Sequence, residues 1–147
     1  MVIEKYDFDN ILKMDPMHDS YATDFIFESN QFKIVYDDLK QGVLDKDGNP
    51  YYKHNKVTIT YKHNYNDCSY VDIRLFKGNK FQSVEVEEFF NAIKGCKIRS
   101  FIFNVDAFQQ ITLSFSIYKY KNGKYVKYKY SSFEIQFDLS EVIYEWE

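Results

Sequence analysis

The feature that most constrains this chain is the dipeptide Asn122-Gly123, which lies between two long segments of alternating apolar and polar residues. A two-residue type I′ turn requires φ > 0 at both central positions, which asparagine and glycine tolerate better than other residues. Before the turn, apolar residues occupy every second position, as in a strand with one buried face. They are Ile111, Leu113, Phe115 and Ile117. The sequence therefore predicts a long antiparallel hairpin from Gln110 to Leu139.

The second strand of this hairpin changes its apolar face partway along. Its large residues stand at even positions up to Tyr130 and at odd positions from Phe133 onward. Because successive side chains of a strand point to opposite faces, this change needs an inserted residue, and we predict a β-bulge at Ser131-Ser132. The register that follows pairs Ile117 with Tyr128, Phe115 with Tyr130, Leu113 with Phe133, and Ile111 with Ile135.

Further alternating segments predict additional strands, connected as successive hairpins. Residues 21–28 and 31–36 flank the turn Ser29-Asn30, and the other predicted strands cover residues 57–61, 69–76, 97–104 and 142–146. Near the N-terminus, a short helical turn is expected at residues 9–13, ended by Pro16. No segment shows the alternation of strands and helices that produces parallel sheets.

One amphipathic helix is expected after residue 83. Ser83 is a suitable N-cap, glutamates follow in the first turn, and Gly95 fits the C′ position. Its apolar stripe consists of Val86, Phe89, Phe90 and Ile93. A helix of about 11 residues needs a surface to pack on, and the strand at residues 97–104 offers one. The predicted fold is α+β, mainly β: a curved antiparallel sheet of about seven or eight strands with one helix packed on it, in a single domain of residues 1–147.

Composition and cysteine usage give general expectations. The chain has 147 residues, of which 20% are aromatic, and a net charge of −3, too small to indicate a partner by itself. Cys68 and Cys96 form neither a metal-binding spacing nor a disulfide framework. The N-terminal residues lack the pattern of a signal peptide, and no apolar stretch reaches the roughly 18 residues of a membrane span. We expect a cytoplasmic protein with reduced thiols and no membrane contact; the oligomeric state stays open.

No catalytic constellation is visible. His18-Asp19-Ser20 contains the residue types of a hydrolase triad, but adjacent side chains on a strand point to opposite faces and cannot align as nucleophile, base and orienting group. The expected role of Asp19 or Ser20 is instead to hydrogen-bond the start of a strand. Neither a Gly-x-Ser-x-Gly elbow nor a phosphate-binding glycine loop is present. The sequence therefore predicts a protein that is not an enzyme and has no cofactor.

Two polar segments resemble metal sites only superficially. Asp45-Lys46-Asp47-Gly48-Asn49, within the long polar connection between Asp38 and Asn55, begins like a calcium loop. However, its sixth position is Pro50 rather than glycine and its twelfth is Lys56 rather than glutamate, so a turn is expected. Four more candidate ligands have no known ligand spacing and are expected on the surface: His54, His63, Asp67 and Cys68. We predict no metal site.

The tip of the long hairpin is the most suggestive segment. Residues 118–130 contain five lysines, five tyrosines and no acidic residue, so the remainder of the chain carries a charge of −8. The predicted register places five of these residues on one face: Tyr118, Tyr120, Tyr125, Lys127 and Lys129. Three roles remain open: stabilisation of the ribbon by cross-strand pairs, contact with a protein partner, and binding of single-stranded nucleic acid. Protein contact is favoured over nucleic acid because the acidic remainder would repel a polyanion.

The segment Met17-His18-Asp19-Ser20, followed by Phe25-Ile26-Phe27 and Phe32-Lys33-Ile34, resembles a group of small, cytosolic, β-rich bacterial proteins. In that group a [Leu/Met]-His-Asp-[Ser/Cys] segment leads into a hairpin, and its members are uncharacterised or resemble immunity proteins. Here Ala22-Thr23-Asp24 departs from the usual apolar alternation. The resemblance implies action through a surface, so it assigns no site residues. We expect a non-enzymatic protein-binding domain, of the immunity or inhibitor type of a bacterial toxin system; the alternatives are a nucleic-acid-binding module using residues 118–130 and a small cytosolic protein of another role.

Overall fold

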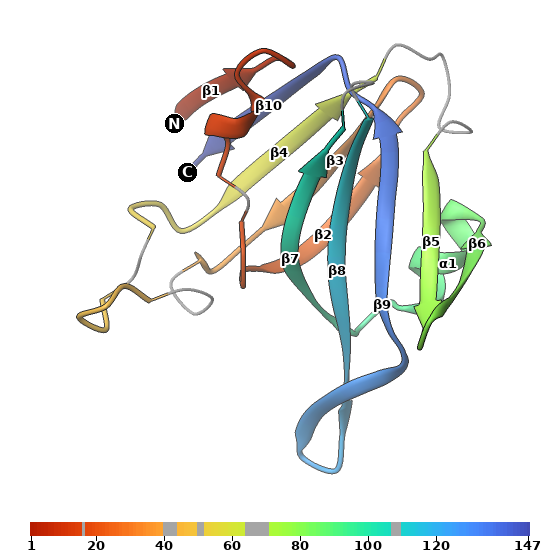
Figure 1. Ribbon diagram of the computed structural model, residues 1–147. Helices are drawn as coiled ribbons and strands as arrows, with labels where there is room; N and C mark the ends of the chain where they lie inside the picture. Colours follow the sequence, from red (N-terminus) through yellow and green to blue (C-terminus); the bar gives the residue numbers. More distant parts are fainter. Residues whose placement is uncertain (16, 40–43, 50–51, 64–70, 107–109) are drawn as a thin grey trace.

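A computed structural model describes residues 1–15, 17–39, 44–49, 52–63, 71–106 and 110–147. In these residues ten strands form one antiparallel sheet, accompanied by one α-helix and one 3-10 helix (Figure 1). The strands are β1 (Val2–Tyr6), β2 (Tyr21–Phe27), β3 (Gln31–Tyr36), β4 (Val57–Lys62), β5 (Asp72–Lys77), β6 (Lys80–Val84), β7 (Lys97–Val105), β8 (Gln110–Lys121), β9 (Lys124–Asp138) and β10 (Glu141–Trp146). The helices are η1 (Ile11–Lys13) and α1 (Val86–Ala92). The mainly-β, α+β prediction is confirmed, and the strand count exceeds the expected seven or eight.

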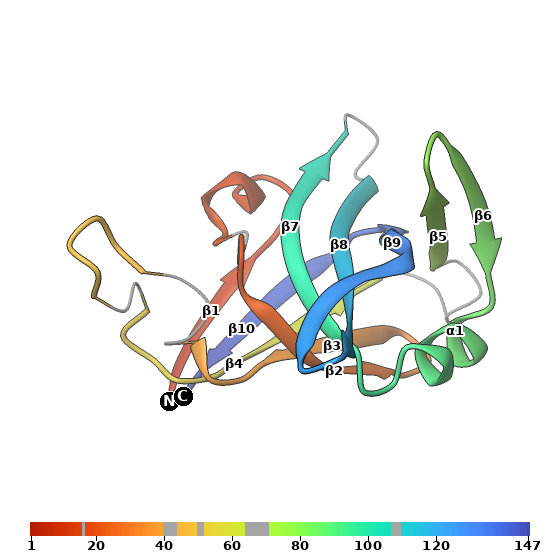
Figure 2. The ribbon, with the colours of Figure 1, turned by 90° about the horizontal axis from the view of Figure 1, so that it is seen from below.

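The sheet order is β1-β10-β4-β3-β2-β7-β8-β9-β5-β6. Its two halves of five strands join where β2 meets β7, through only two paired positions, Tyr21 with Arg99 and Ala22 with Ile98. Figure 2 shows the strong curvature that results. Side chains from the two halves meet inside this curve: the ring of Phe32 on β3 lies 4.8 Å from that of Phe137 on β9. The core therefore lies between the halves of a single folded sheet.

Every second residue of most strands faces this core, as the alternating pattern predicts. In β10, for example, Val142, Tyr144 and Trp146 are buried, whereas the residues between them are partly exposed. Phe133 of β9 is fully buried and is a centre of aromatic packing. Four rings from β2, α1 and β8 surround it at centroid distances of 4.9–6.2 Å: Phe25, Phe89, Phe90 and Phe115. Aromatic packing thus links the helix to both halves of the sheet.

The amphipathic helix is shorter than expected. Its N-cap is Glu85 rather than Ser83, and the Glu85 carboxylate accepts hydrogen bonds from the backbone amides of Glu87 and Glu88. Glutamate thus performs the capping role that serine, threonine, asparagine or aspartate usually fills, and Ser83 belongs to β6 instead. The apolar stripe is confirmed, since Phe89 and Ile93 are buried and the partly buried Val86 and Phe90 pack against the core.

The turn of the long hairpin is confirmed, because φ is 53° at Asn122 and 82° at Gly123. A break in strand pairing is also present, but the predicted register beyond it is wrong. Consecutive pairs are Tyr118 with Lys127 and Ser116 with Ser132, two positions apart on β8 and five apart on β9. Three residues are therefore inserted rather than one. Beyond the break Phe115 pairs with Phe133, Leu113 with Ile135, and Ile111 with Phe137.

Several smaller expectations can be compared with the structure. The turn near the N-terminus is η1, and the hairpin of β2 and β3 is confirmed. The edge strands β1 and β6 were not expected. Cys96 is a free thiol, whereas Cys68 lies outside the described residues. Neither helix in the described part of the chain has the length and apolar character required to cross a membrane.

Candidate interaction surface

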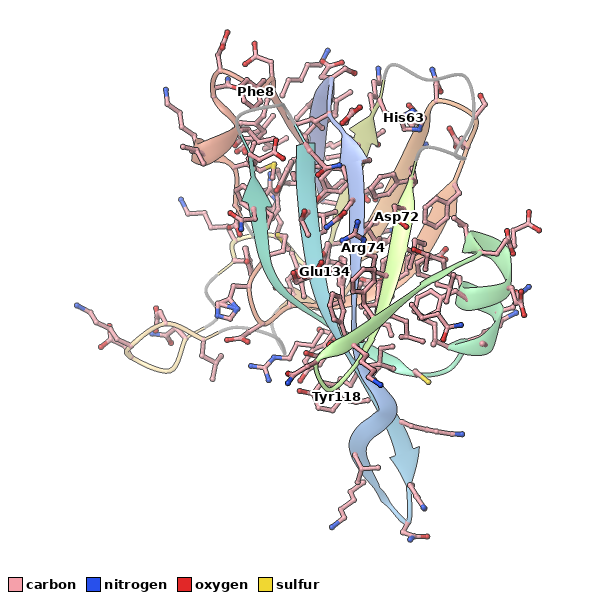
Figure 3. The ribbon with its side chains drawn as sticks, turned by 45° about the vertical axis from the view of Figure 1, so that its right-hand side comes forward. Phe8, His63, Asp72, Arg74, Tyr118 and Glu134 are labelled. Atoms are coloured by element: carbon pink, nitrogen blue, oxygen red, sulfur yellow. The ribbon has the colours of Figure 1, made fainter. Side chains whose placement is uncertain are left out.

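The ends of β8 and β9 form a two-stranded arm, which we define as residues 118–127. Figures 1 and 3 show the arm projecting from the body of the sheet, with Tyr118 labelled where it leaves the body. Near the tip, Lys121 pairs directly with Lys124. The arm's exposed lysines include Lys119, Lys121 and Lys124. Positive charge therefore lies at a place that a large partner can approach without contacting the body.

Of the five residues predicted to form a binding face, the structure describes the side chain of Tyr118. The side chains of Tyr120, Tyr125, Lys127 and Lys129 lie outside the described residues, so their common face remains a prediction. The backbone register around the turn is the predicted one, because Tyr118 pairs with Lys127 and Tyr120 with Tyr125. Lys129 falls within the irregular segment between Lys127 and Ser132, which the prediction of a single inserted residue did not anticipate.

At the base of the arm, Arg99 of β7 connects two segments that are distant in the sequence. Its guanidinium donates a hydrogen bond to the Asp19 carboxylate and also hydrogen-bonds the Tyr118 side chain. Burial lowers the pKa of Arg99, but the hydrogen bonds and charges of Asp19 and Tyr118 outweigh this effect and raise the pKa above its usual value. Arg99 therefore stays charged and holds the start of β2 against the base of the arm.

A second cation lies beside this network. The Lys97 ammonium lies 4.1 Å from the centroid of the Tyr21 ring, within the range of a cation–π interaction. Lys97 pairs with Tyr118, and Tyr21 pairs with Arg99, so these four residues lie on adjoining rungs. Sequence reasoning did not identify Tyr21, Lys97 or Arg99. The alternation of Lys97 and Arg99 with Ile98 marks an outward face, but no sequence signal connects this face to the hairpin.

The segment His18-Asp19-Ser20 forms a tight turn rather than a catalytic site. Asp19 has φ of 67°, and the backbone amide of Ser20 donates to the carbonyl of Met17 at 3.0 Å. Asp19 and Ser20 then exchange backbone hydrogen bonds with Ser100. Ser20 is fully buried, and its Oγ has no hydrogen-bond partner in the described part of the chain. The predicted role at the start of a strand therefore fits, with the Asp19 carboxylate directed to Arg99.

The segment resembling a calcium loop folds as a turn. The Asp45 carboxylate accepts hydrogen bonds from the backbone amides of Asp47 and Asn49, both at 2.9 Å. The Gly48 amide donates to the Asp45 carbonyl at 3.0 Å. The carboxylate that would begin a calcium site is thus used by the loop's own amides. Among the described residues no group of three or more His, Cys, Asp or Glu side chains is placed to hold a metal ion.

The histidines near strand β4 lie apart. His54 precedes the strand and packs against Trp146, with 5.8 Å between ring centroids. His63 follows the strand and is buried, although it was expected on the surface. Six strand residues separate the two by roughly 20 Å at 3.3 Å per residue. Asp67 and Cys68, the other two candidate ligands, lie outside the described residues.

Comparison of the chain with models of protein families, with curated proteins and with solved structures found no match in any of the three. The resemblance of residues 17–34 to small bacterial proteins with a His-Asp segment before a hairpin therefore remains an expectation from the sequence.

Proposed function

We propose that this chain is a non-enzymatic protein-binding domain, of the immunity or inhibitor type, whose arm contacts an acidic surface of a partner protein. The observation that carries the proposal is the projection of a lysine-rich ribbon from an otherwise acidic body. Lysines alone provide long-range attraction, which increases the rate of encounter more than the final affinity. Affinity also needs buried contact area, which tyrosines supply while losing little side-chain freedom.

The residues at the base of the arm extend this surface toward the body. Arg99 and Lys97 add positive charge, and Tyr21 and Tyr118 add aromatic area, all on paired rungs of β2, β7 and β8. The Asp19–Arg99–Tyr118 network connects three segments at the base, so it limits the freedom of the arm's base before a partner binds. Such preorganisation reduces the entropy lost on association.

The proposal is tested by co-expression with the product of the adjacent gene, the natural candidate for the partner of an immunity protein. If a complex forms, its dissociation constant is measured by titration calorimetry for the unmodified chain and for Lys121→Glu with Lys124→Glu. We expect the double variant to weaken binding by about tenfold or more, since like charges at an interface cost several kcal/mol. The matched control is Lys5→Glu with Lys80→Glu, two exposed lysines on other strands.

The control variant should bind within about threefold of the unmodified chain, because exposed charges far from an interface are largely screened. Equal weakening by both pairs would show that only net charge matters, and it would remove the arm from the interface. The absence of any complex with the neighbouring product, together with no other stable partner on co-purification, would contradict the protein-binding proposal.

A second candidate function is binding of single-stranded nucleic acid, favoured by the alternation of lysine with tyrosine along residues 118–130. This function requires that a labelled oligonucleotide bind at low salt and dissociate by about 0.2 M salt, because counterion release makes affinity fall steeply. It also requires that Lys127→Glu with Lys129→Glu abolish the binding. Purified protein free of nucleic-acid absorbance and without such binding would eliminate this candidate.

A further inference from the structure

A pocket of about 340 Å³ lies at the far side of the molecule from the arm, where β1 and β10 pair and both chain ends lie (Figure 1). Its walls come from three separate segments: Glu4 of β1, Asp15 after η1, and Tyr52, Lys53 and His54 before β4. Trp146 of β10 completes it. The pocket opens to solvent and is separate from the interaction surface proposed above.

Aromatic rings form much of this pocket. Tyr52 stacks on Trp146 with 5.8 Å between ring centroids and an interplanar angle of 29°. The His54 ring lies at the same distance from Trp146 on a tilted plane. The negative π-faces of such rings attract cations, and indole is the strongest of them. This arrangement therefore provides a surface on which a weakly hydrated organic cation can rest.

Two carboxylates make the pocket electronegative. Glu4 accepts a hydrogen bond from the Tyr6 hydroxyl at 2.6 Å, and Asp15 accepts one from the Tyr52 hydroxyl at 3.1 Å. Burial, together with the charges of Glu4 and Asp15, raises the pKa of Tyr6 to about 12, so the negative potential extends to neighbouring groups. Lys53 is the opposing charge of the lining, and it is exposed.

The pocket also has an unused hydrogen-bond donor. Trp146 is only 6% exposed, and its Nε1–H has no acceptor in the described part of the chain. A buried N–H without an acceptor costs roughly 1–3 kcal/mol of stability, which a ligand oxygen would recover. The donor, the rings and the carboxylates together specify both ends of a ligand: a cationic end and an end with a hydrogen-bond acceptor.

We infer that this pocket binds a small organic ammonium compound that carries a hydrogen-bond acceptor near its cationic group. The cation lies against the rings of Tyr52, His54 and Trp146, within the field of Glu4 and Asp15. The acceptor pairs with Trp146 Nε1–H. The same ammonium chemistry is available from a free amine or from a lysine side chain of a peptide, and the experiment distinguishes these sources.

The chain contains a single tryptophan, Trp146, so its intrinsic fluorescence reports directly on this pocket. Choline is titrated against the folded protein, with 3,3-dimethyl-1-butanol as the neutral analogue of the same shape and N-acetyl-lysine amide as the peptide analogue. We expect a saturable fluorescence change with choline and binding at least about tenfold weaker for the neutral analogue, the scale of a desolvated cation–π contact. Tighter binding of the lysine derivative would identify a peptide as the source.

Glu4→Gln removes one carboxylate charge while keeping an oxygen that can accept from Tyr6. We expect this variant to bind choline about fivefold more weakly, as for loss of a partly exposed charge partner. The matched control is Glu145→Gln, which removes the same charge from the other face of β10 and should bind within about twofold. Equal binding of choline and its neutral analogue, or no saturable change with any cation up to about 50 mM, would overturn the inference.

Discussion

Replacement of Phe133 by alanine is the most direct test of how the core is held together. The side chain is fully buried, and four rings lie around it at centroid distances of 4.9–6.2 Å. Truncation of a buried phenylalanine costs about 3–5 kcal/mol, because apolar burial is lost and a cavity remains. Each favourable aromatic pair adds roughly 0.5–1.5 kcal/mol beyond its buried area. We therefore expect Phe133→Ala to cost about 5 kcal/mol.

The free energy of unfolding is measured by urea titration, followed by far-UV circular dichroism and by the fluorescence of Trp146. A loss of about 5 kcal/mol is a large part of the roughly 5–15 kcal/mol that stabilises a typical domain. Phe133→Leu keeps most of the volume and should cost about 1.5 kcal/mol. Phe81→Ala is the exposed control: this ring is 56% exposed, so its loss should cost about 1 kcal/mol or less.

A cost below about 2 kcal/mol for Phe133→Ala would refute this reasoning, because it would show that the surrounding rings close the cavity or that Phe133 does not join the helix to the two halves of the sheet. A cost for Phe81→Ala equal to that of Phe133→Ala would contradict the burial that distinguishes them.

Four other changes have defined outcomes. Burial and the Glu4 and Asp15 charges raise the pKa of Tyr6 to about 12; folding therefore favours its protonated form, and stability should fall as pH rises from 10 through 12, measured by urea midpoints at each pH. Ionisation of all 14 tyrosines near pH 10 in the folded protein, followed by ultraviolet absorbance, would contradict this. Asp19→Asn keeps a residue that tolerates φ of 67° but removes the charge facing Arg99, so we expect a loss of about 1 kcal/mol in urea. Gly123→Ala introduces a side chain at φ of 82° and should cost about 1 kcal/mol; an unchanged thermal midpoint would exclude the observed turn. Thiol titration in denaturant without reductant should count two reactive cysteines, since Cys96 is free, and a count of zero would indicate a disulfide.

The long hairpin could be predicted in part because one turn type accepts few sequences. Asn122-Gly123 specified the turn, and alternation specified the buried face on both sides of it. The number of inserted residues could not be obtained in this way. A reversal of faces reports only that the number of inserted residues is odd, so insertions of one and of three produce the same pattern. The side chains of residues 128–131 lie outside the described part of the chain.

Edge strands were missed because alternation is a signal of partial burial. In β6 most residues are exposed, and β1 is similar, so neither segment has a buried face to mark in its sequence. The network of Asp19 with Arg99 was missed for another reason. These residues are 80 positions apart, and the contact follows from how β2 is placed beside β7, which local patterns do not specify. The start of the helix differed because Glu85 caps two amides itself.

The narrow junction between β2 and β7 divides the protein into two cooperative units for hydrogen exchange. Only two paired positions join five strands on one side to five on the other. Within each half, strands pair over longer stretches, so their amides are protected until that half opens as a whole. Amide exchange under native conditions should therefore show two groups of slowly exchanging strands, with faster exchange at the junction. Separation there would expose the faces of Phe32 and Phe137 to solvent without unfolding either half.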